Sequence, residues 1–174
     1  MKTLSKCTMA FIGVAILATT ALAQRNGRAT AKLSLHDQTV SIDYGQPALK
    51  GRAVEDMLGK LPAGGFWRLG ADQSTTFTTS SDLAFGDVTV PKGVYSLWAE
   101  HTGDNEWKLA FNKQHGQWGT DHDSSKDFAF VPLKESQAGD SAEKVTIELT
   151  HHQGGGAISI RWGNMELATD FTVK

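Results

Sequence analysis

Side chains that could do acid–base or metal chemistry gather in one stretch of this sequence, from Asn112 to Asp123. His115 and His122 flank a glycine-containing segment, and Asp121 precedes the second histidine. Imidazole and carboxylate groups serve as metal ligands and as general acids and bases. The spacing matches no established metal signature, however, and solvated loop histidines are the simpler interpretation. We therefore expect no metal and no cofactor.

Signatures of covalent and glycosidase catalysis are not evident. The sequence has no G-x-S-x-G nucleophile elbow, and its acidic residues are too scattered to suggest a glycosidase pair. We accordingly assign no catalytic residue. A secreted hydrolase-type enzyme that uses Asp121, His122 or His115 is kept as the competing hypothesis.

Two tryptophans lie among glycines and polar residues, where an exposed ring could form a sugar-binding platform. The predicted ligand-binding residues are Trp67, Arg68, Asn112, Gln117, Trp118 and Asp121. The competing interpretation, commoner for tryptophan, is that both rings plug the ends of the fold. Arg68 likewise has two possible roles, rimming a pocket or forming a structural tie to Asp72 or Asp43.

The elements that must position these residues are strands, because apolar and polar residues alternate along most of the chain. We expect about ten to twelve short strands at a spacing of about 8–12 residues. They fall at residues 32–35, 39–44, 66–69, 75–79, 83–85, 88–90, 94–100, 107–112, 128–130, 144–149, 158–162 and 167–173. A single helical turn is expected at 54–58.

This pattern predicts an all-β domain, specifically an antiparallel two-sheet β-sandwich. A jelly-roll is one form that such a sandwich could take, and a closed β-barrel is the alternative. Trp107 and Trp162 lie on the apolar faces of their expected strands and are predicted to be core residues. Trp98 shares its face with a mixed set of residues, so the sequence leaves its burial open.

The N-terminal segment 1–23 has the pattern of a secretory signal peptide. Lys2 and Lys6 precede an apolar run at residues 9–18, which is too short to span a bilayer, and Ala21-Leu22-Ala23 offers a cleavage site. Residues 24–174 would then form a single periplasmic or secreted domain with no membrane span.

The single cysteine, Cys7, falls within the expected signal peptide. A cysteine-free mature chain can use neither disulfides nor a cysteine nucleophile. The whole chain has 17 basic and 19 acidic residues and no basic stretch that could follow a phosphate backbone, so we expect no nucleic-acid partner.

Several motifs in this chain occur together in one known family. They are Ile42-Asp43-Tyr44-Gly45-Gln46-Pro47 with Lys50-Gly51-Arg52, Trp67-Arg68-Leu69-Gly70-Ala71-Asp72, Val90-Pro91-Lys92-Gly93-Val94-Tyr95-Ser96-Leu97, Phe111-Asn112-Lys113, Gln117-Trp118-Gly119 and Ile160-Arg161-Trp162-Gly163. With these motifs the chain resembles the exported bacterial family catalogued as domain of unknown function 2911. The resemblance implies export and a β-rich fold, and it brings no catalytic residues. His122 departs from the family pattern, which has an aromatic such as tyrosine there.

Together these observations favour an exported, non-enzymatic binding or accessory module. Its ligand would be a glycan, another small polar molecule or a partner protein.

Overall fold

The computed structural model describes residues 26–103 and 106–174, and the expected signal peptide lies outside these ranges. The described residues form an all-β fold with ten strands and one short α-helix. The elements are β1 (Gly27–Leu35), β2 (Gln38–Gln46), α1 (Val54–Leu58), β3 (Gly65–Trp67), β4 (Thr76–Thr79), β5 (Leu83–Phe85), β6 (Val88–Val90), β7 (Gly93–Gly103), β8 (Glu106–Asn112), a 3-10 turn (Ser124–Lys126), β9 (Asp127–His152) and β10 (Gly155–Val173).

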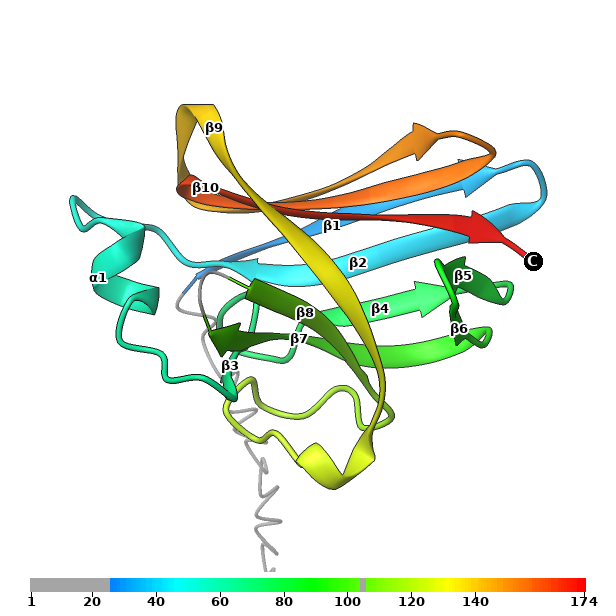
Figure 1. Ribbon diagram of the computed structural model, residues 1–174, viewed down its shortest axis with the longest axis horizontal. Coiled ribbons are helices and arrows are strands. Elements are labelled where there is room, and N and C mark those ends of the chain that lie inside the picture. Colours follow the sequence, from blue (N-terminus) through cyan, green and yellow to red (C-terminus); the bar gives the residue numbers. More distant parts are fainter. Residues whose placement is uncertain (1–25, 104–105) are drawn as a thin grey trace, which may run out of the picture.

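The strands make one antiparallel sheet in the order β1-β2-β4-β7-β8-β9-β10-β5-β6, with β3 attached to β7. The long β9 bends across the molecule, so that its first part pairs with β8 and its later part with β10 (Figure 1). The sheet therefore folds into two layers, as the sandwich prediction required. It is not closed into a barrel, because β1 and β6 stand at opposite ends of the strand order.

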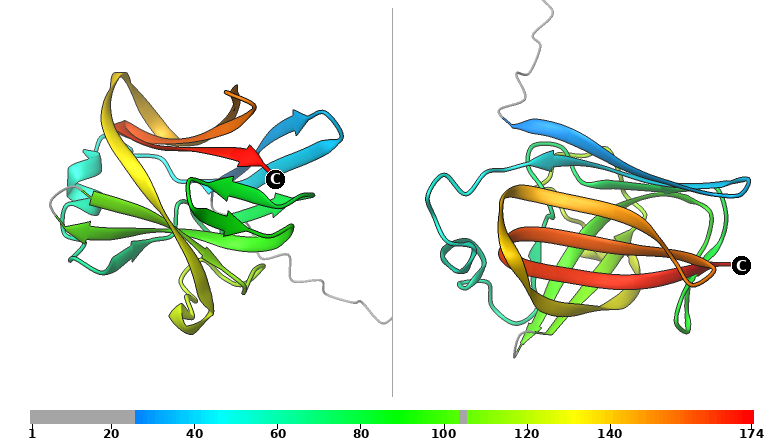
Figure 2. Two further views of the ribbon diagram at one scale, coloured as in Figure 1. Left: turned by 45° about the vertical axis from the view of Figure 1, so that its right-hand side comes forward. Right: turned by 90° about the horizontal axis from the view of Figure 1, so that it is seen from above.

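The strand β10 turns back on itself at Gly163. The φ angle of this residue is 60°, which glycine adopts readily but other residues adopt only with strain. Ser159 Oγ donates a hydrogen bond to Glu166 Oε1 at 2.6 Å, across the two arms of the strand. Near the other end of these arms, Gly155 lies against the backbone of Phe171, with no room for a Cβ. The two arms lie side by side in the view from above (Figure 2).

The hydrophobic core lies between the two layers and includes Trp107 and Trp162, as predicted. Its largest fully buried side chains include Phe77, Phe111 and Phe171. Tyr44 ties the layers together, because its hydroxyl accepts from the backbone N–H of Ile147 at 3.0 Å. Among the residues that the structure describes, no helix is long and apolar enough to cross a membrane.

The structure differs from the sequence-based expectation chiefly in β9. We expected separate strands at 128–130 and 144–149, but residues 127–152 form one continuous strand. Residues 134–144 within it are mostly exposed. A strand segment without a buried face shows no hydrophobic alternation, so the sequence gives no signal for it. The expected helical turn at 54–58 is confirmed as α1.

Candidate functional site

A pocket of about 390 Å³ lies beside β3, where the outer face of the sheet meets two loops. We call this the Arg68 pocket. Its walls come from α1 and the loop after it (Met57, Leu58, Leu61), from the sheet (Phe66, Trp67, Trp98), from Arg68, and from Gly119, Thr120 and His122 of a second loop. Side chains from segments far apart in the sequence thus meet at one place.

The alternation of β3 decides which aromatic ring faces the pocket and which faces the core. Trp67 is 6% exposed and stacks on Trp162, with ring centroids 5.8 Å apart and planes at 10°. Phe66 points the other way and meets the ring of His122 edge-on, with centroids 4.4 Å apart. Because successive strand residues face opposite sides, Trp67 forms the floor between core and pocket, whereas Phe66 is an outer wall.

Arg68 follows β3 and is half-buried, and its Cδ lies close to Gly119, where a Cβ would come within 3.3 Å of it. No carboxylate among the described residues lies within ion-pair distance of its guanidinium. The two aspartates that could have formed a structural tie have other partners. Asp43 accepts a hydrogen bond from Arg28 Nε at 2.8 Å, and Asp72 accepts one from the backbone N–H of Asn26 at 3.1 Å.

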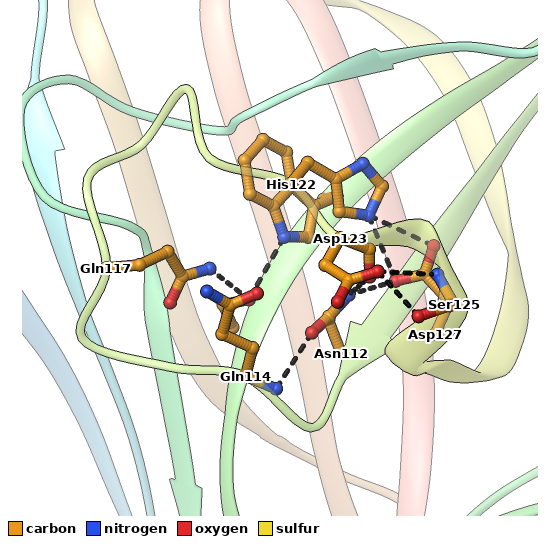
Figure 3. Close-up of polar contacts among 9 residues, drawn as sticks. Asn112, Gln114, Gln117, His122, Asp123, Ser125 and Asp127 are labelled. Atoms are coloured by element: carbon orange, nitrogen blue, oxygen red, sulfur yellow. Dashed lines mark hydrogen bonds and ion pairs between the residues drawn. The ribbon is translucent and has the colours of Figure 1, made fainter.

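The loop from Lys113 to Lys126, which we call the covering loop, joins β8 to β9 and contacts the outer face of β7. His122 in this loop stacks on Trp98, with ring centroids 4.3 Å apart and planes at 21°. Its Nε2 lies 3.0 Å from both carboxylate oxygens of Asp127, whose side chain is 3% exposed (Figure 3). A carboxylate only accepts, so Nε2 is the donor in this contact.

Asn112 anchors the base of the covering loop from a fully buried position. Its Nδ2 donates to Asp127 Oδ1 at 2.7 Å and to the carbonyl of Asp123 at 2.8 Å, while its Oδ1 accepts from the backbone N–H of Gln114 (Figure 3). Each of these bonds satisfies a group that the loop removes from water. Asn112 therefore holds the loop in place.

A second set of bonds joins the middle of the covering loop to β7. Gln117 Nε2 and Trp98 Nε1 both donate to Ser96 Oγ, at 3.3 and 3.0 Å. Further along, Ser125 Oγ donates to Asp123 Oδ1 at 2.6 Å, and this hydrogen bond lowers the pKa of the Asp123 carboxyl below its usual value. The loop is thus bonded to the rest of the protein and within itself.

The six predicted ligand-binding residues fall into three groups. Trp67 and Arg68 line the Arg68 pocket together, and Asn112 and Gln117 support the covering loop. Trp118, which is 45% exposed, and Asp121 lie on the surface of that loop and do not line the pocket.

Sequence reasoning missed Phe66 and Trp98 as pocket residues. It named His122 only as a possible catalytic group. The alternation within residues 66–69 could have identified Phe66, because only one of two neighbouring strand residues can face the core.

The chemistry available at the Arg68 pocket is that of one guanidinium, one imidazole and one hydroxyl among apolar walls. No group of three or more histidine, cysteine or acidic side chains among residues 26–103 and 106–174 is placed to hold a metal ion. His115 and Asp121 are exposed, and neither lines this pocket.

Comparison with known proteins identifies a family but no function. No curated protein and no solved structure matches the chain. Residues 26–171 match the family described as "Protein of unknown function (DUF2911)", in agreement with the resemblance seen in the motifs. This match spans both layers of the fold and the whole Arg68 pocket, and the chain belongs to the DUF2911 family.

Proposed function

We propose that the protein is an exported, non-enzymatic binding module whose ligand is a small polar molecule held in the Arg68 pocket. The observation that carries this proposal is the half-buried Arg68, which has no carboxylate partner among the described residues and stands between apolar walls. Ligand sites are typically concave and mostly apolar, with a few polar groups that fix orientation. This pocket has that composition.

A glycan lying on Trp118 is supported less well, because that ring stands outside the pocket lining. The hydrolase alternative has one observation in its favour, the orientation of His122 by Asp127 at 3.0 Å, as expected for a general base. Among the described residues, the one hydroxyl that lines the pocket is that of Thr120, which donates to Asp121 Oδ1 at 3.4 Å rather than to His122. Binding therefore remains the function that we propose.

The test is a thermal-shift screen of sugars and small polar molecules, repeated with a variant whose pocket is filled. Thr120→Trp places a large ring at the exposed rim of the pocket, and Thr150→Trp makes the same change at an exposed site on β9. We expect ligands that raise the melting temperature of the wild type and of Thr150→Trp but not of Thr120→Trp. Equal shifts in both variants would place the ligand elsewhere, and no shift with any compound would remove the support for a binding module.

Export is the part of the proposal that concerns residues outside the described ranges. It rests on the segment 1–23, with its basic start, apolar run and small-residue cleavage site. N-terminal sequencing of the protein from its native host should find Gln24 as the first residue. Recovery of chains that begin at Met1 would contradict cleavage and, with it, the periplasmic or secreted location.

A further inference from the structure

The lining of the Arg68 pocket carries a single formal charge. Arg68 supplies it, and no aspartate or glutamate lines the pocket. His122 can add a second positive charge only when protonated. The lining residues therefore favour a ligand that carries a negative charge.

The guanidinium of Arg68 is free to donate hydrogen bonds to a ligand. It has five N–H groups in a planar fork, and the structure gives it no hydrogen-bond acceptor among the described side chains. Gly119 packs against its aliphatic stem, where a side chain would crowd Cδ. No Arg68 nitrogen is among the buried polar atoms that lack a hydrogen bond, so solvent reaches the guanidinium. An anionic ligand would replace that water with charge-assisted hydrogen bonds.

Apart from His122 and Thr120, the rest of the lining is mostly apolar. Met57, Leu58 and Leu61 form one wall, and Phe66 forms another. One permanent positive charge among such walls matches a ligand with one negative charge and an apolar body. A phosphate would bring up to two charges, for which the pocket offers one fixed cation. A carboxylate matches both the charge and the two-pronged geometry of the guanidinium.

We propose that the ligand of the Arg68 pocket is a monocarboxylate with an apolar or aromatic body, and that its carboxylate pairs with the Arg68 guanidinium. This inference rests on the proposed function and narrows its ligand to one chemical class. The apolar body of the ligand lies between Phe66 and the wall formed by Leu58 and Leu61.

The experiment measures binding of three probes to the purified protein by isothermal titration calorimetry: phenylacetate, its neutral analogue phenylacetamide, and phenyl phosphate. Because the probes are small, we expect a Kd for phenylacetate on the order of a millimolar. Phenylacetamide and phenyl phosphate should each bind at least about tenfold more weakly, since the first lacks the charge-assisted bonds and the second has an uncompensated charge.

Two variants assign the effect to Arg68. Arg68→Gln should weaken phenylacetate binding by about tenfold or more and leave phenylacetamide unaffected, while Arg68→Lys should recover part of the loss. Lys60→Gln removes the same charge from an exposed site near α1 and should change nothing. Binding of phenylacetate to the wild type should also weaken as salt is added, which requires no variant.

The outcomes separate this inference from the proposed function. Equal affinity for phenylacetate and phenylacetamide, or unchanged affinity in Arg68→Gln, would overturn the carboxylate assignment. The carboxylate assignment would also be overturned if phenylacetate did not bind at tens of millimolar, or if phenyl phosphate bound more tightly than phenylacetate. If neutral compounds from the screen still bind the wild type but not Thr120→Trp, the proposed function stands while this inference fails.

Discussion

The imidazole of His122 lies nearly parallel to the indole of Trp98, with 4.3 Å between the ring centroids and 21° between the planes. This stacking explains why Trp98, on the outer face of β7, is only 4% exposed. Asp127 holds the imidazole from its edge, so one residue of the covering loop is fixed by two neighbours in β7 and β9. The position of the loop, and with it one wall of the pocket, depends on this arrangement.

The His122–Asp127 pair should contribute measurably to stability. In a double-mutant cycle with His122→Ala and Asp127→Ala, we expect a coupling energy of about 1–3 kcal/mol, because both groups are largely buried and hydrogen-bonded. The matched control is His152 with Asp170, whose side chains are 42% and 64% exposed and 3.6 Å apart. That pair should couple by about 0.5 kcal/mol or less in urea unfolding. Similar coupling energies for the two pairs would show that the His122–Asp127 contact does not hold the covering loop in place.

The two tryptophans of the predicted site should differ strongly in their effect on stability. Trp67→Ala removes a ring that stacks on Trp162 and meets Trp107 edge-on, and should cost about 3–5 kcal/mol of unfolding free energy. Trp118→Ala removes an exposed ring and should cost under about 1 kcal/mol. Denaturant unfolding measures both. A small loss for Trp67→Ala would mean that this ring is not part of the core.

A methyl group at Gly119 should disturb the contact between the covering loop and Asp72. The backbone N–H of Gly119 donates to the carbonyl of Asp72 at 2.7 Å, and a Cβ would lie 2.7 Å from that oxygen. Gly119→Ala should therefore cost about 1–3 kcal/mol through local displacement of the backbone. Gly139→Ala is the control, because nothing lies within 4 Å of a Cβ there, and it should change stability by about 0.5 kcal/mol or less. If Gly119→Ala left stability unchanged, the backbone of the covering loop could shift at this point at little cost.

Stability should fall at high pH partly because of Tyr95. Burial of this residue and the nearby Asp82 carboxylate raise the pKa of Tyr95 above its usual value of 10.0, and its hydroxyl donates to the carbonyl of Pro91 at 2.9 Å. As the pH rises, the unfolded chain loses the phenolic proton before the folded one does. The contribution to stability is therefore present below about pH 10 and is lost as the pH rises through the folded pKa.

The check is urea unfolding of the wild type and of Tyr95→Phe at a series of pH values around and above 10. The free energy of unfolding should decline less steeply with pH in Tyr95→Phe, because it has no phenol to ionise at this position. Parallel declines in the two proteins would mean that the burial of Tyr95 does not govern its ionisation.

The sequence alone determined the fold class and much of the core. The alternation around Ile42, Leu109 and Ile160 sends every second side chain to one face, and each of these three residues is fully buried. Trp107 and Trp162 were placed in the core by the same reasoning. Such patterns are local, because a strand with one buried face carries that information in its own residues.

Only the tertiary structure decided the middle of β9 and the make-up of the pocket. Within residues 134–144, residues 134–137 and Ala142 pair with β10, and Lys144 pairs with Ala48 after β2. Exposed side chains carry no record of such backbone pairing. Likewise, the stacking of His122 on Trp98 and the meeting of Arg68 with Gly119 depend on how the covering loop docks on distant segments of the chain. Contacts between segments remote in sequence are set by the packing of the whole sheet, which spacing along the chain does not encode.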